Sequence, residues 1–172
     1  DLGARLLTLL HRSADSESPL VREAIKDLRA LLEALDIPPR SLSQMLSAWK
    51  LEFEERCQSA DVELRWQQCG EYPLSLLTPE SQHQLQRIVR EAVSNALRHA
   101  SPTYVAITVD LKGGRLSISI KNDGSVTEGG SAGRGMSIMR QRITDLQGEL
   151  NIKIEDGCWV IDVLVDMSEI IA

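Results

Sequence analysis

After residue 60, apolar and polar residues alternate in short runs, at residues 62–66, 105–109, 116–120, 150–154 and 159–165. Alternation with a period of two is typical of a strand that buries only one face. Glycine-bearing turns at residues 112–115 and 155–157 separate consecutive runs and predict two β-hairpins. The sequence therefore predicts a sheet that needs a covering layer on one face.

Two segments with helical spacing can supply that layer. Thr78 and Pro79 predict the N-cap and the first position of a long helix that ends before Pro102. A second helix is predicted from about Met136 to Leu146, with Gly148 as its C-cap residue. The fold class is therefore α+β, a two-layer α/β sandwich with a mixed sheet and helices on one face.

The first sixty residues have a helical pattern instead. Leucine-rich spacing predicts a helical hairpin over residues 1–37, and Pro38 and Pro39 interrupt its second helix. A connecting helix is predicted over residues 38–60, and the sandwich over residues 61–172. Trp49 and Phe53 are expected to pack between the connecting helix and the sandwich.

Charge and cysteine content narrow the classes of function. The 172 residues carry a net charge of −6, which argues against a nucleic-acid-binding surface. The three cysteines form no CxxC pair and are expected to be reduced thiols in a cytoplasmic protein. Every apolar run is too short to span a bilayer, and the chain looks cut at its start, so a membrane anchor is expected only through absent upstream regions.

The long helix and two glycine-bearing segments form the most informative constellation. Glu91 and Asn95 are four residues apart and so share a helix face, with Arg98 near the same line. The segments 122–124 (Asn-Asp-Gly) and 133–136 (Gly-Arg-Gly-Met) follow. Alone, the helix pair is typical of a solvated face and Asn-Asp-Gly of a turn. Together they suit a magnesium-bound nucleotide.

These motifs resemble the ATP-binding domain of sensor histidine kinases, which has the Bergerat (GHKL) fold, and most closely the subfamily that includes bacterial nitrate sensors. The resemblance covers nearly the whole chain and is strongest over residues 85–150. It implies a homodimeric enzyme of two-component signal transduction that transfers the γ-phosphate of Mg-ATP to a histidine. A response regulator then accepts the phosphate on an aspartate.

The resemblance also implies roles for individual residues. Glu91 would be the general base that acts on the attacking imidazole, and Asn95 would be the Mg²⁺ ligand. The residues implied to contact the nucleotide are Asn95, Arg98, His99, Asn122, Gly124, Gly133, Gly135 and Met136. Met136 and Met139 are also typical of core packing, and residues 124–131 are expected to form the ATP lid.

The chain departs from the family pattern Asp-x-Gly-x-Gly at two positions. Strand alternation puts Asn122, not Asp123, in the slot of the adenine-binding aspartate. An asparagine oxygen still accepts a hydrogen bond from the adenine amino group, without the charge-assisted component. Val126 stands where the family has the second glycine. Both departures predict weaker nucleotide binding.

The segment Asp1-Leu2-Gly3 looks like the one that follows the phosphoacceptor histidine in this subfamily, which places that histidine two residues before Asp1. None of His11, His83 and His99 fits the acceptor motif, and His83 is expected to face solvent. This piece is therefore expected not to phosphorylate itself. The intact hairpin would pair with a second copy as a four-helix bundle.

Three functions remain open from the sequence. The first is the catalytic portion of a histidine kinase. The second is a non-catalytic signalling module that acts by dimerisation and partner binding, which Asn122 and Val126 motivate. The third is another member of the same superfamily, such as an ATPase or a kinase acting on serine, and the leucine-rich hairpin argues against it.

Overall fold

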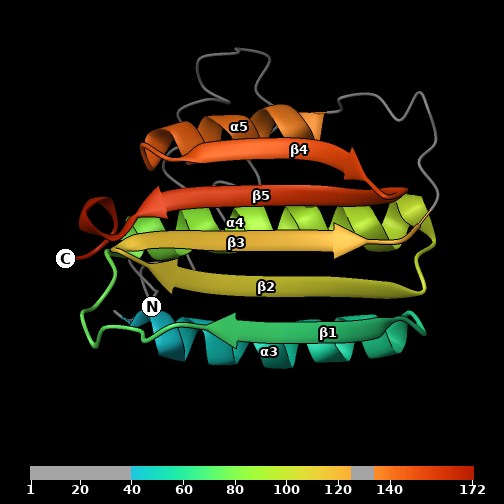
Figure 1. Ribbon diagram of the computed structural model, residues 1–172, viewed down its shortest axis with the longest axis horizontal. Coiled ribbons are helices and arrows are strands. Elements are labelled where there is room, and N and C mark those ends of the chain that lie inside the picture. The colour runs from blue at the N-terminus through green and yellow to red at the C-terminus, as the bar shows by residue number, and fades with distance from the viewer. Residues whose placement is uncertain (1–39, 125–133) are drawn as a thin grey trace, which may run out of the picture. The chain divides into compact units, whose positions relative to one another are not determined.

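The computed structural model describes residues 40–124 and 134–172, which form one five-stranded sheet with helices on one face (Figure 1). The predicted hairpin over residues 1–37, Val126, Gly133 and most of the predicted lid lie outside the described residues. The strands are β1 (Glu63–Cys69), β2 (Tyr104–Lys112), β3 (Arg115–Asn122), β4 (Glu149–Glu155) and β5 (Cys158–Asp166). The helices are α3 (Leu42–Ser59), α4 (Pro79–Asn95) and α5 (Arg134–Asp145), with a π-helical turn η1 (Ala96–Ala100) and a 3-10 turn η2 (Met167–Glu169).

The strand order is β1-β2-β3-β5-β4. β1 runs parallel to β2, and every other neighbouring pair is antiparallel. The two predicted hairpins are confirmed, with positive φ at Gly113 (60°) and Gly114 (78°) in one turn and at Asp156 (53°) and Gly157 (76°) in the other. Two successive residues with positive φ give the turn twist that matches that of the flanking strands. The predicted two-layer mixed-sheet class is confirmed.

One hydrophobic core fills the space between the sheet and the helices. Alternate residues of β2 and β3 are fully buried, and α3 contributes Trp49 and Phe53, which are 1% and 0% exposed. The predicted packing of these two aromatic residues is confirmed. Ser41 caps α3 in a capping box, because its hydroxyl accepts from the Gln44 N–H while the Gln44 side chain accepts from the Ser41 N–H.

Helix α4 begins as predicted, because the Thr78 hydroxyl accepts from the Ser81 N–H at 3.1 Å and Pro79 occupies the first position. The expectation that His83 faces solvent is wrong, since this residue is only 7% exposed. The C-terminal segment lies against this end of the helix, where the Thr78 N–H donates to the Ile170 carbonyl at 3.0 Å. The helical pattern alone does not reveal this contact.

The end of α5 also differs from its prediction. The left-handed residue after the helix is Gln147 (φ 53°), not Gly148. The Gly148 N–H donates to the Ile143 carbonyl at 2.9 Å. A Cβ atom at Gly148 would lie 2.6 Å from the Leu164 carbonyl oxygen, so this glycine is required by its close approach to β5 rather than by its φ.

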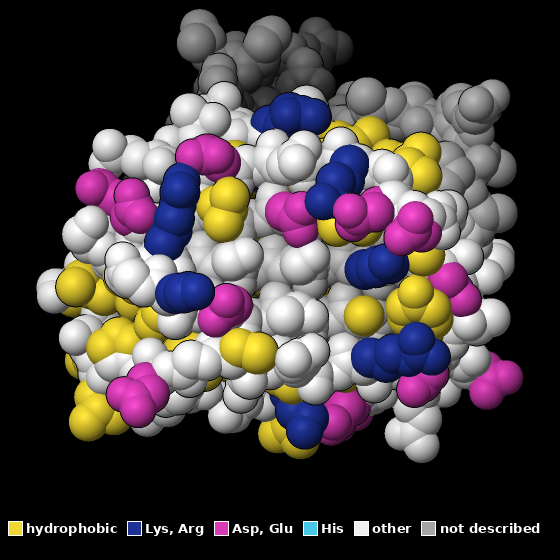
Figure 2. Space-filling view, viewed as in Figure 1, with side chains coloured by type: hydrophobic (Ala, Val, Ile, Leu, Met, Phe, Trp, Pro, Cys, Tyr) yellow, Lys and Arg dark blue, Asp and Glu magenta, His cyan; other side chains and the backbone are white. Residues whose placement is uncertain are grey.

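The outer face of the sheet carries side chains of both charges, interspersed among polar and apolar ones (Figure 2). Ion pairs on this face join Arg65 to Glu63 at 2.7 Å and Lys153 to Asp162 at 3.6 Å. Such pairs contribute little stability in water but suit a solvated surface. All three cysteines are free thiols, as predicted. Among the described residues, no helix is long and apolar enough to span a membrane.

Candidate functional site

Helix α4 presents Glu91 and Asn95 at the margin of its buried face. Both side chains are half-buried, whereas Ala92 and Val93 next to them are buried in the core. Because the two polar residues are four positions apart, the helix brings a carboxylate and an amide onto one side. The predicted pairing of these two groups follows from the register of a helix that the core holds in place.

The helix widens immediately after Asn95 into the π-helical turn η1. Ala96 and Ala100 are buried, whereas Arg98 and His99 are exposed. A π-helical turn holds more residues than an α-helical turn, so Arg98 is turned away from the line that an uninterrupted α-helix would give it. Ser101 then ends the turn in a left-handed conformation, with φ 45°. Single π-helical turns are frequent at functional sites.

The first turn of α5 lies against Glu91. A Cβ atom at Gly135 would overlap Oε1 of Glu91, so the glycine permits an approach that a larger side chain would obstruct. The N-terminal end of a helix carries unpaired N–H groups and a partial positive charge. Met136 is half-buried against the core and Met139 is fully buried. The fold thus joins the second glycine motif to the helix that carries Glu91.

The end of β3 approaches the π-helical turn. A Cβ atom at Gly124 would overlap the backbone and side chain of Ala100, so only glycine fits there. Asn122 is 6% exposed and faces the helices with the apolar residues of β3. Its Nδ2 atom has no hydrogen-bond partner within the part of the chain that the structure describes. The end of β3 therefore carries a buried amide with an unused donor, two residues before the close approach of Gly124 to Ala100.

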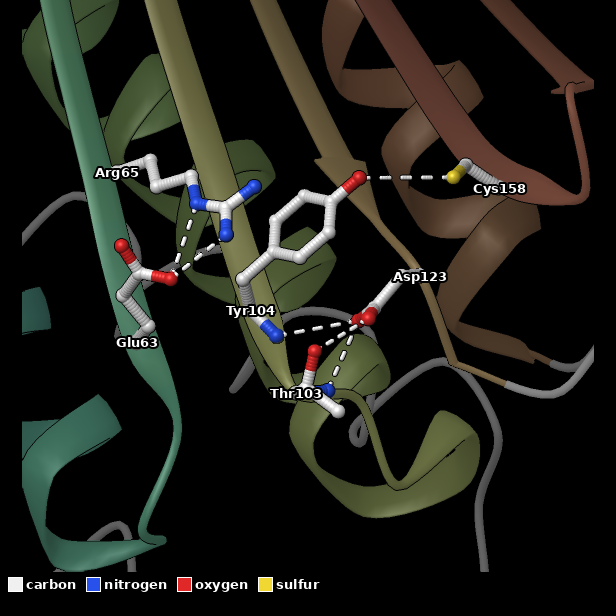
Figure 3. Close-up of polar contacts among 6 residues, drawn as sticks. All are labelled: Glu63, Arg65, Thr103, Tyr104, Asp123 and Cys158. Carbon is white, nitrogen blue, oxygen red and sulfur yellow. Dashed lines mark hydrogen bonds and ion pairs between the residues drawn. The ribbon is translucent and has the colours of Figure 1, made fainter.

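Asp123 points to the other side and has a structural role that the sequence reading missed. Its Oδ1 atom accepts from the N–H groups of Thr103 at 2.8 Å and Tyr104 at 3.1 Å (Figure 3). Its Oδ2 atom accepts from the Thr103 hydroxyl. We call this arrangement the Asp123 clasp. It ties the end of β3 to the start of β2, close to both Asn122 and Gly124.

The Asp123 clasp should affect how the free energy of unfolding depends on pH in the acid range. The hydrogen bond from the Thr103 hydroxyl is the largest cause that lowers the pKa of Asp123. Because the folded pKa lies below the unfolded one, the stabilisation is complete above about pH 5 and is lost as the pH falls through the folded value. We expect Asp123→Asn to flatten the fall of the denaturant midpoint between about pH 5 and pH 3.

Asp156→Asn, the same change in the turn between β4 and β5, is the matched control and should keep the steep fall of the unaltered chain. Superimposable acid profiles of Asp123→Asn and the unaltered chain would contradict a stabilising role for the clasp.

The outer face beside the clasp is covered by Tyr104. Its ring lies under the Arg65 guanidinium, whose Cζ atom is 3.9 Å from the ring centroid, and its hydroxyl is 3.6 Å from Sγ of Cys158 (Figure 3). The contact with Cys158 raises the pKa of the Tyr104 hydroxyl. These contacts join β1, β2 and β5, and no local sequence signal indicates them.

A polar network joins α3 to α4 next to the predicted site residues. Arg90 forms a two-bond pair with the Glu52 carboxylate at 2.7 Å and 2.7 Å. Arg56 donates to the Ser94 hydroxyl at 2.5 Å, and its Nη1 atom lies 3.6 Å from Oε1 of Glu52. Arg90 and Ser94 each precede a predicted site residue in the chain, so the network sets the position of the helix face that carries them. The partners are 38 residues apart and cannot be paired from sequence.

Known proteins share this architecture and sequence pattern. The family model described as "Histidine kinase-, DNA gyrase B-, and HSP90-like ATPase" matches residues 80–168. The sensor histidine kinase YvfT of Bacillus subtilis is 24% identical over 152 residues, which is 88% of this chain and 37% of that protein. The signal transduction histidine-protein kinase/phosphatase UhpB of Salmonella typhimurium is 29% identical over 143 residues, which is 81% of this chain and 28% of that protein.

The fold has solved counterparts as well. The histidine kinase domain of the Erythrobacter litoralis EL346 blue-light activated histidine kinase aligns with a TM-score of 0.63 and 16% identity, over 98% of this chain and 87% of that one. At this identity the likeness concerns the fold. The chain spans only about a third of the length of the two curated relatives.

Proposed function

Because the chain belongs to the family of histidine kinase-, DNA gyrase B- and HSP90-like ATPases, we propose that it is the ATP-binding catalytic part of a sensor histidine kinase. In this proposal the larger protein is a homodimer that transfers the γ-phosphate of ATP to a histidine ahead of Asp1. A response regulator then accepts the phosphate. The free thiols fit a cytoplasmic location for this part.

The contact between Gly135 and Glu91 supports the proposal most directly. It brings the N-terminal turn of α5 against the Glu91 carboxylate of α4. An anion such as a phosphate is stabilised by N–H groups at a helix N-terminus. The glycine keeps that turn free of a side chain, which leaves the backbone accessible.

The donor set also fits a magnesium nucleotide. Among the described residues, no group of three or more His, Cys, Asp or Glu side chains is arranged to hold a metal ion. Mg²⁺ prefers oxygen ligands and is commonly held by one or two protein groups together with phosphates and water, which suits the amide oxygen of Asn95. Bound magnesium would neutralise part of the negative charge of the phosphates.

The residues of the chain then divide the remaining work. Glu91 orients the attacking imidazole and takes its proton, as a general base does. Arg98 and His99 are exposed within the π-helical turn, where they are available to the phosphates. Asn122 contacts the base, and Gly124 and Gly135 keep the flanking backbone free of side chains. The half-buried Met136 borders this group.

A non-catalytic signalling module is the second candidate, because Asn122 replaces the aspartate that the family resemblance implies at this position. An uncharged amide forms a weaker hydrogen bond with the adenine amino group than a carboxylate does. This candidate differs from the first in whether the site still binds nucleotide.

Titration calorimetry with Mg-ATP separates the two candidates. We expect a dissociation constant between about 10 μM and 1 mM, because the donor set is retained with one weakened hydrogen bond. Mg-AMP, which lacks the two outer phosphates, serves as the control ligand and should bind more weakly. Absence of any heat of binding with Mg-ATP up to several millimolar would favour the non-catalytic module.

A further inference from the structure

Asn122 places a buried amide at the end of β3, where the proposed function puts the nucleobase. The side chain is 6% exposed, and its Nδ2 atom finds no hydrogen-bond partner within residues 40–124 and 134–172. A buried N–H group left unpaired is unfavourable by about 1–3 kcal/mol, so such groups are uncommon unless a ligand or water pairs with them. The unused donor therefore indicates an acceptor on whatever occupies this position.

The sheet holds this amide in a defined position. Asn122 lies on a central strand and is paired in register with Val105 of β2 on one side and Trp159 of β5 on the other. The Asp123 clasp secures the next residue to Thr103 and Tyr104. Because both neighbouring strands and the clasp restrain the backbone, the amide stays on the helix-facing side of the sheet.

We propose that Asn122 reads the N1–C6 edge of a purine and lets the site bind 6-oxopurine nucleotides about as well as 6-aminopurine nucleotides. This inference rests on the proposed function. An amide offers one donor and one acceptor side by side. With a 6-aminopurine, Oδ1 accepts from the exocyclic amine and Nδ2 donates to N1. With a 6-oxopurine, Nδ2 donates to O6 and Oδ1 accepts from N1–H.

An aspartate at the same position would not match both edges. An ionised carboxylate only accepts hydrogen bonds. It pairs with the exocyclic amine of a 6-aminopurine, but it meets the O6 lone pairs of a 6-oxopurine with a second set of lone pairs. A site that leaves a polar group of its ligand opposed or unpaired discriminates strongly against that ligand. The neutral amide removes this discrimination because it presents a donor to O6.

The test compares ADP with IDP, which differ only at the N1–C6 edge, by calorimetric titration into the whole chain with Mg²⁺ present. For the unaltered chain we expect the two dissociation constants to agree within about threefold. For Asn122→Asp we expect the ratio of the IDP constant to the ADP constant to rise about tenfold or more. Asn151→Asp makes the same change at an exposed position of β4 and should leave the ratio unchanged.

Three outcomes are informative. If ADP binds to the unaltered chain more than about tenfold more tightly than IDP, the inference is overturned while the proposed function stands. An unchanged ratio in a folded Asn122→Asp variant overturns it as well. If neither diphosphate binds to the unaltered chain, the proposed function itself fails. The ratio for the unaltered chain is decisive even if the Asn122→Asp variant does not fold.

Discussion

Asn95→Ala is expected to abolish the gain in nucleotide affinity that Mg²⁺ provides, while leaving the fold intact. The side chain is half-buried at the last position of α4, and alanine is the best helix former, so the helix should tolerate the change. The lost amide oxygen is the proposed protein ligand of the metal. Loss of a group that only orients a metal ligand already weakens metal binding by about 10–100-fold, so loss of the ligand itself should weaken it at least as much.

The measurement is a pair of ATP titrations, one with Mg²⁺ and one with a chelator. The unaltered chain should show a large difference between the two conditions, and Asn95→Ala should show almost none. Asn151→Ala is the matched control, because it removes an exposed amide from β4 on the far edge of the sheet. A magnesium dependence of Asn95→Ala equal to that of the unaltered chain would remove the metal assignment.

Glu91→Gln is expected to slow phosphotransfer by about 10²–10⁴-fold and to spare ATP binding. Glutamine has nearly the same shape as glutamate, so the contact with Gly135 is kept, but an amide cannot accept the proton of the imidazole. The experiment needs the longer protein that includes the phosphoacceptor histidine. Transfer of label from γ-labelled ATP gives the rate, and calorimetry gives the affinity.

A second variant tests the same carboxylate without changing it. The Cβ atom of Gly135→Ala would overlap Oε1 of Glu91, which is the far end of a flexible side chain, so the carboxylate moves while the fold is kept. Phosphotransfer should fall in this variant too.

Glu71→Gln, at an exposed position before α4, is the control for Glu91→Gln and should keep the full rate. An unaltered rate in Glu91→Gln would show that this residue is not the base.

Local signals were sufficient for most of the elements. Neighbouring residues decide where α4 starts, at Thr78 and Pro79. They also decide the two hairpin turns, at Gly113–Gly114 and Asp156–Gly157. Strand alternation correctly separated Asn122 from Asp123, because a period of two assigns adjacent residues to opposite faces. The predicted burial of Trp49 and Phe53 follows from helical spacing in the same way.

Contacts between distant segments were not accessible from the sequence. The helical pattern did not indicate the burial of His83, and the requirement for Gly148 depends on a carbonyl of β5. Likewise, the Asp123 clasp joins residues 20 and 19 positions apart, and the pairing of Arg56 with Ser94 spans 38 positions. Such contacts depend on how the layers pack. A short stretch of sequence carries no information about that packing.

The amino-acid pattern by itself determined that this protein has a one-sided sheet covered by helices, and that one helix carries Glu91 and Asn95 on a common side. Periodicity and turn chemistry are local, so they can be read without knowing the fold. Only the tertiary structure decided the parallel pairing of β1 with β2, the close approach of Gly135 to Glu91 and the unpaired amide of Asn122. These features arise because chain segments distant in sequence are packed at van der Waals separation, where an added methyl group or an unpaired donor changes what can bind.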